Sequence, residues 1–121
     1  MKTIDNYIKG IDELALARAK RYLDGNKVKS VKFLRDPLDP DEFEAFVEES
    51  KNQVLLPEIE VDGQFRVQDI HCQCKNHEQL CIHKVALLLA AQIMIDTNCP
   101  DYHMALKLQT ANALNRIFFP S

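Results

Sequence analysis

The chain has 121 residues, of which 46% are hydrophobic and 27% charged, with a formal net charge of −3 at pH 7. This length suits one domain, 1–121, with one modest core. The composition is that of a globular protein and excludes a disordered tail. The longest apolar run, VALLLAAQIMI, is interrupted by Gln92 and is too short to span a membrane. Asp5 and Asn6 stand where an export signal needs apolar residues, so we expect a cytoplasmic protein with no membrane partner.

The charge is unevenly distributed along the chain. Residues 1–35 hold nine Lys and Arg against four acids, and residues 36–62 hold one Lys against ten acids. Both segments are compatible with ordinary solvated faces. The alternative is a basic surface that the N-terminal part presents to a partner.

A short helix, a longer helix and a strand are predicted at the start of the chain. Thr3 is placed to cap the short helix, and Gly10 to break it. The run DELALARAKRYLDG begins at Asp12, contains strong helix formers and has Gly25 as its stop signal. The run KVKSVKFL then alternates as in a half-buried strand. Its predicted faces are Lys29, Val31 and Phe33 on one side and Val28, Ser30 and Lys32 on the other.

The segment DPDEFEAFVEES fits two kinds of element. Asp39 and Pro40 are typical of a helix start. Phe43, Ala45 and Val47, however, alternate with Glu44, Phe46 and Glu48 as in a strand. Periodicity alone does not choose between the two.

The remaining elements are a hairpin and two helices. LPEIEVDGQFRVQDIH predicts a β-hairpin around an Asp-Gly turn at 62–63, and its second strand runs directly into Cys72. After Cys81 comes IHKVALLLAAQIMIDTN, which is apolar on most of its surface and predicts a largely buried helix. A closing helix is predicted over 101–118.

Four metal-ligand residues lie between the hairpin and the buried helix. Cys72, Cys74, Cys81 and His83 form the pattern C-x-C-x6-C-x-H. Tetrahedral zinc needs its sulfurs about 3.8 Å apart. Residues two apart on an extended strand face the same way, so Cys72 and Cys74 can reach one ion. Cys81 and His83 converge only where the chain enters a helix, with Cys81 at or before the N-cap.

Two further expectations concern the ligands. The helix N-terminus should favour the Cys81 thiolate and so lower the pKa of that group. His77 and His71 compete with His83 for the fourth position. His71 is disfavoured because it lies on the opposite face of the strand from Cys72, whereas His77 lies in a loop and is the real rival. We favour His83 because the helix holds it in place.

Other chemistry explains the cluster less well. A disulfide between Cys72 and Cys74 would close a small, strained ring and leave Cys81 without a role. A Cys–His nucleophile needs one cysteine and an orienting group that we do not find. A catalytic zinc would use three protein ligands and an open position. Cys99 is too far along the helix to share the ion. A structural zinc ion, Zn²⁺, is therefore the predicted cofactor.

The segment CQCKNHEQLCIH resembles the SWIM zinc fingers, whose signature is C-x-C, a variable spacer and C-x-H on a β-hairpin followed by a helix. Ala86 matches an alanine of the recombination-associated members. Upstream, ALARAKRYLDGNKVKSVKF looks like the helix and first strand that precede the finger in bacterial Swi/Snf-type ATPases. The resemblance covers about residues 14–95 and implies a finger core at 57–95, an N-terminal helix and strand at 11–34, and a strand at 42–49.

The resemblance implies a non-catalytic module that binds DNA or protein. SWIM modules occur in chromatin-type ATPases, Mutator-type transposases and recombination accessory proteins. The chain has no Walker A motif, so we expect an accessory module of, or partner to, a nucleic-acid-dependent ATPase or recombination complex. The alternative is a regulatory or assembly subunit that contacts only protein through its acidic strands. We therefore expect an α+β zinc-binding domain that is not an enzyme, with candidate DNA contacts at Arg18, Lys20, Arg21, Lys27, Lys29 and Lys32.

Overall fold

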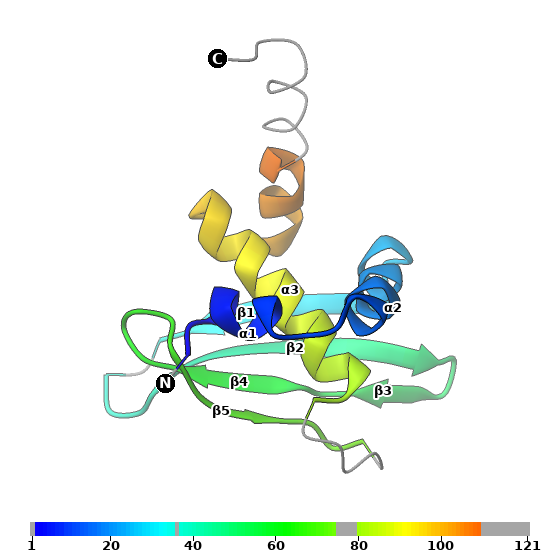
Figure 1. Cartoon of the computed structure of the whole chain (residues 1–121), viewed down its shortest axis with the longest axis horizontal. Helices are drawn as coiled ribbons and strands as arrows, with labels where there is room; N and C mark the ends of the chain where they lie inside the picture. Colours follow the sequence, from blue (N-terminus) through cyan, green and yellow to red (C-terminus); the bar gives the residue numbers. More distant parts are fainter. Residues whose placement is uncertain (1, 36, 75–79, 110–121) are drawn as a thin grey trace, which may run out of the picture.

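The computed structural model describes residues 2–35, 37–74 and 80–109. It confirms the predicted α+β class (Figure 1). Residues 102–109 are helical and lie within the closing helix predicted at 101–118, whose remaining residues fall largely outside the described part. The other elements in chain order are α1 (Ile4–Lys9), α2 (Glu13–Asp24), β1 (Val28–Leu34), β2 (Asp41–Ser50), β3 (Gln53–Leu55), β4 (Glu58–Val61), β5 (Val67–His71) and α3 (Ile82–Thr97).

The strands form one antiparallel sheet in the order β1-β2-β4-β5, with the short β3 paired to β2. The ambiguous segment is strand β2, so its alternative prediction as a helix is wrong. Phe43, Ala45 and Val47 are buried on one face of β2, as the alternation indicated. Because β2 pairs along both of its edges, tertiary pairing overrides the local signals for a helix start.

The predicted hairpin is present as β4 and β5. Its turn is organised by Asp62, whose Oδ1 accepts hydrogen bonds from the backbone N–H groups of Gln64 and Arg66, each at 2.9 Å. The N-terminus is attached to the same hairpin, because the N–H of Val67 donates to the carbonyl of Lys2 at 2.7 Å. The second strand ends at His71, one residue before the first candidate ligand.

The predicted faces of β1 are correct for Val31 and Phe33, which both pack on the core side, and wrong for Val28 and Lys29. The ladder with β2 shifts register between Lys29 and Lys32, and Ser30 has a φ of 53°. This bulge puts Val28 and Val31 on the buried side although they are three residues apart, and it leaves Lys29 exposed. A β-bulge breaks the two-residue period from which the faces were predicted.

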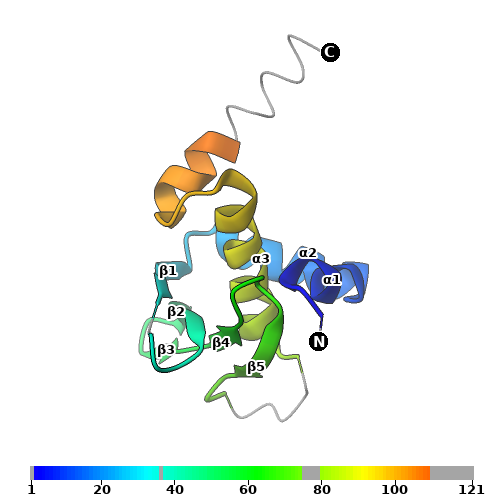
Figure 2. The ribbon, with the colours of Figure 1, turned by 90° about the vertical axis from the view of Figure 1, so that its left-hand side faces the viewer.

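Helix α3 is the centre of the molecule. It contacts the sheet on one side, and it contacts α1 and α2 as well (Figure 2). This position explains why its sequence is apolar on most sides, and why eight of its residues are buried. His83 is among these eight and is the one buried polar residue recorded in the described part of the chain.

The helix ends follow the sequence signals. The Oγ1 of Thr3 accepts from the N–H of Asn6 at 3.2 Å, and Gly10 is the C-cap of α1. Asp12 caps α2, which ends at Gly25. No helix among the described residues is long and apolar enough to cross a membrane.

Candidate metal centre

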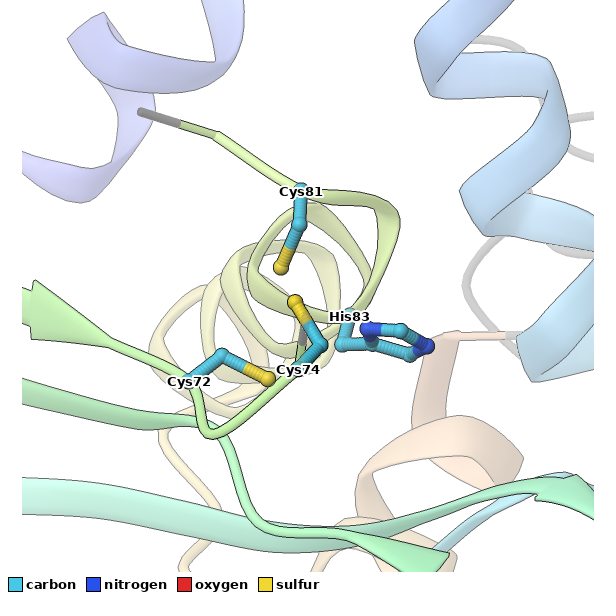
Figure 3. Close-up of side chains that lie close together, drawn as sticks. All are labelled: Cys72, Cys74, Cys81 and His83. Carbon is cyan, nitrogen blue, oxygen red and sulfur yellow. The ribbon is translucent and has the colours of Figure 1, made fainter. Parts of the chain in front are cut away.

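The structure brings together all four predicted ligands. One ligand atom from each of Cys72, Cys74, Cys81 and His83 lies within 4.8 Å of the others. Figure 3 shows the three sulfurs turned toward a common centre in front of the first turn of α3. All four cysteines are free, so the disulfide alternative is not realised.

Two chain segments supply the ligands. Cys72 follows the last residue of β5, and Cys74 lies two residues further on. Cys81 is the N-cap of α3, as predicted, with extended backbone angles (φ −72°, ψ 165°) and no capping hydrogen bond from its side chain. The extended N-cap followed by the first helical turn lets Cys81 and His83 face the same point. Cys81 and His83 are buried, whereas Cys72 and Cys74 are partly exposed.

The two ring nitrogens of His83 have different surroundings. Nε2 lies 2.5 Å from Oε2 of Glu49. Nδ1 is buried and has no hydrogen-bond partner among the described residues. One ring nitrogen lies on the side of the sulfurs and the other at the far end of the ring (Figure 3). Since Nε2 is engaged with Glu49, Nδ1 is the nitrogen that faces the thiols.

Sequence reasoning missed Glu49 and Tyr22. Glu49 is at the next inward position of β2 after Phe43, Ala45 and Val47, whose side chains are buried. Its carboxylate therefore lies on the same face of the strand as these apolar side chains. The hydroxyl of Tyr22, on α2, donates to Glu49 Oε1 and Oε2 at 3.1 and 3.0 Å. The signal that could have found Glu49 is the alternation itself, because a Glu on the apolar face of a strand needs a partner.

The acidities of these groups follow from their contacts. The hydrogen bond from His83 is the largest influence on Glu49 and holds the pKa of its carboxyl below its usual range. Burial, followed by the Glu49 contact, raises the pKa of Tyr22. Burial also raises the pKa of the Cys72 thiol to about 12.

Among the protein groups around Cys81, the net effect on its pKa is opposite to the expected lowering. Burial raises the pKa of this thiol, and the backbone N–H groups of Lys84 and His83 act in the opposite direction without prevailing. The helix N-terminus therefore favours the thiolate as predicted, but desolvation is the larger effect.

The other candidate residues lie apart from this cluster. His71 points to Glu58, with 2.7 Å between its Nε2 and a carboxylate oxygen, as its disfavoured position implied. His77 lies outside the described residues. Cys99 donates from its thiol to the carbonyl of Asp101 at 3.4 Å and is not among the clustered ligands.

The six basic residues predicted to contact DNA are all exposed. Three of them have a carboxylate or an aromatic ring recorded as a neighbour. Lys29 pairs with Glu48 at 2.8 Å, Lys32 lies opposite Glu44 in the β1–β2 ladder, and Lys27 sits over the ring of Tyr22. The other three, Arg18, Lys20 and Arg21, lie on α2.

The donor set fits a metal ion. Three sulfurs and an imidazole nitrogen converge, and the buried Nδ1 of His83 lacks any other partner in the described part of the chain. Such a nitrogen is costly to bury unless something binds it. The structure therefore places Cys72, Cys74, Cys81 and His83 to bind a metal ion. No family model, no curated protein and no solved structure matches the chain.

Proposed function

We propose that the chain is a structural zinc module of the SWIM type, with Cys72, Cys74, Cys81 and His83 as ligands. The observation that carries the proposal is the convergence of four ligand atoms within 4.8 Å. A set of three thiolates and one imidazole suits Zn²⁺, because hard cations such as Mg²⁺ and Ca²⁺ take oxygen ligands.

The proposed role of the zinc is structural, and the module is proposed not to be an enzyme. Four protein ligands complete a tetrahedral shell, whereas a catalytic zinc keeps one position for water or substrate. The ion would join the end of β5 to the start of α3, which are separated along the chain by residues 72–81.

Metal analysis of the purified protein tests this proposal. We expect one zinc per chain, and we expect Cys81→Ser to lose the metal. Cys99→Ser is the matched control, and it should keep full metal content. Chelation should lower the thermal stability of the native protein, because structural metal binding contributes to folding free energy. Substoichiometric metal together with stability that is indifferent to chelator would contradict the proposal.

The proposed partner is DNA, contacted through the exposed basic residues of α2 and β1. The proposal rests on the resemblance to SWIM modules and on the surplus of basic residues in positions 1–35. Contacts of this kind would reach phosphates and carry no base preference. An accessory role beside a nucleic-acid-dependent ATPase or a recombination complex would use such binding.

A protein partner is the second candidate, and the sheet supplies the observation that favours it. The face of β2 and β4 away from the core carries Glu42, Glu44, Glu58 and Glu60, which lie opposite one another in the ladder. These carboxylates would repel DNA. Under this alternative the acidic strands are the contact surface, and no nucleic acid is bound.

A further inference from the structure

We infer that Glu49 is a positioning residue that selects Nδ1 of His83 as the metal-binding nitrogen, and that Tyr22 in turn positions Glu49. This inference rests on the proposed metal function and deepens it. It extends the site beyond the C-x-C-x6-C-x-H pattern to strand β2 and helix α2.

The first step concerns the tautomer of His83. A carboxylate that is ionised at neutral pH has only acceptor atoms, so its 2.5 Å contact with Nε2 requires a proton on that nitrogen. A neutral imidazole with its proton on Nε2 has its lone pair on Nδ1. That nitrogen is buried, has no hydrogen-bond partner among the described residues and faces the thiols (Figure 3).

The second step concerns orientation. Only 8% of the His83 side chain is exposed. The Tyr22 ring packs edge-on against the imidazole, with 6.1 Å between the ring centroids. Glu49 and Tyr22 therefore restrict the imidazole from two directions. A ligand held in its binding orientation before the metal arrives loses less entropy when the metal binds.

The third step concerns Glu49 itself. Both of its carboxylate oxygens accept from the hydroxyl of Tyr22, and Oε2 also accepts from His83. The β2–β3 ladder shifts register between Glu48 and Ser50, and such irregularities re-aim the side chain between them. A carboxylate hydrogen-bonded to the outer nitrogen of a metal-bound histidine fixes the ring and increases its basicity as a ligand.

Nitrogen-15 NMR of the zinc-loaded wild-type protein tests the inference without any substitution. We expect the His83 side chain to show zinc on Nδ1 and a proton on Nε2. Zinc bound through Nε2 would overturn the inference and leave the proposed function intact. Absence of bound zinc would overturn the proposed function and the inference with it.

Variants test the roles of the two positioning residues. Glu49→Gln should lower zinc affinity by about 10- to 100-fold while zinc still binds at one equivalent. Tyr22→Phe keeps the ring and loses the hydroxyl, so we expect a loss of about three- to tenfold, the effect of one hydrogen bond. Glu48→Gln is the matched control, because the neighbouring Glu48 pairs with Lys29 instead of a ligand.

The outcomes separate positioning from general stability. Loss of affinity for Glu49→Gln well beyond that of Glu48→Gln, with a faster release of zinc, supports the inference. Equal affinities for the two variants would overturn it. The His83 nitrogen signals supply a second readout. They should show a mixture of Nδ1 and Nε2 ligation, or exchange broadening, in Glu49→Gln, and unchanged Nδ1 ligation in Glu48→Gln.

Discussion

His83 combines two properties that rarely coincide in one residue, burial and an unsatisfied ring nitrogen. Its Nδ1 has no hydrogen-bond partner in the described part of the chain, and its ring is fixed by Glu49 and Tyr22. Burying an unpaired polar group costs free energy, so this nitrogen is a local weak point unless something binds it. Metal binding would remove that cost.

We predict that His83→Ala weakens zinc binding more than substitution of any other histidine. Zinc affinity should fall by more than the roughly 10- to 100-fold that is typical when a residue that only supports a ligand is replaced. His71→Ala is the matched control, because His71 contacts Glu58 and lies outside the cluster. Competition with a chelator of known affinity measures each constant. A larger loss for His77→Ala than for His83→Ala would show that His77 is the ligand.

A second residue with unusual acidity lies on the outer face of the sheet. Burial, a hydrogen bond with Glu58 and the charges of its acidic neighbours raise the pKa of Glu42 to about 7. The unfolded value is near 4.5, so between these values the native state binds more protons than the unfolded state. The contribution of Glu42 to stability is therefore largest at low pH and is lost as pH rises toward 7.

We predict that Glu42→Gln stabilises the protein at pH 8 and does so less at pH 5. The glutamine cannot ionise, so it removes a repulsion that exists only when Glu42 is charged. Urea unfolding of zinc-loaded wild type and variant at both pH values measures the difference. Glu48→Gln should instead destabilise the protein about equally at both pH values, because the hydrogen bond with Lys29 lowers the pKa of Glu48 and its contribution is lost only below the unfolded value of 4.5. A Glu42→Gln gain that is equal at both pH values would contradict the prediction.

At the scale of elements, β1 shows how one residue redirects a strand. Ser30 adopts a positive φ of 53° at the register shift of the β1–β2 ladder. This conformation turns the strand so that Val28 and Val31 both reach the core. A left-handed conformation costs an L-residue roughly 1–2 kcal/mol, and glycine avoids most of that cost.

We predict that Ser30→Gly stabilises the protein by up to about 1 kcal/mol, net of the added flexibility of the unfolded chain. Ser30→Val should destabilise it by about 1–2 kcal/mol, because a branched side chain fits a positive φ poorly. Ser50→Gly is the control. Ser50 is exposed and is not among the described residues with positive φ, so glycine there should destabilise. Thermal unfolding measures all three, and a destabilising Ser30→Gly would contradict the argument.

The elements that the sequence predicted correctly are those with local signals. Thr3 and Asp12 cap the first two helices, and the pattern around Cys81 located both the start of α3 and the ligand cluster. Two features lacked a local signal. The bulge at Ser30 depends on pairing with β2, and the Glu49–His83 contact joins residues that are 34 positions apart. Such contacts depend on how the strands pair in space.

At the scale of the whole molecule, the basic and acidic segments are not separated as their order along the chain suggested. β1, which carries Lys29 and Lys32, pairs with the acidic β2, so two basic residues lie beside carboxylates. The basic residues of α2 are less compensated. Arg18, Lys20 and Arg21 are exposed, and no ion pair of theirs occurs among the described residues. Helix α2 is therefore the stronger part of the proposed DNA surface.

The last prediction concerns that surface. The zinc-loaded protein should bind labelled duplex or single-stranded DNA at low salt, with modest affinity that falls steeply as salt is added, because phosphate contacts release counterions. Arg18→Glu with Arg21→Glu should remove most of this binding, since i and i+3 residues are neighbours on one helix face. Adding Lys27→Glu and Lys29→Glu should remove the remainder.

Lys51→Glu with Lys107→Glu changes the net charge equally at two exposed positions outside the proposed surface, and it should retain binding. Fluorescence anisotropy at two salt concentrations measures each variant. The DNA proposal is wrong if the wild type does not bind at low salt, or if the Arg18/Arg21 variant binds as well as the wild type. The acidic strands then become the expected contact surface for a protein partner.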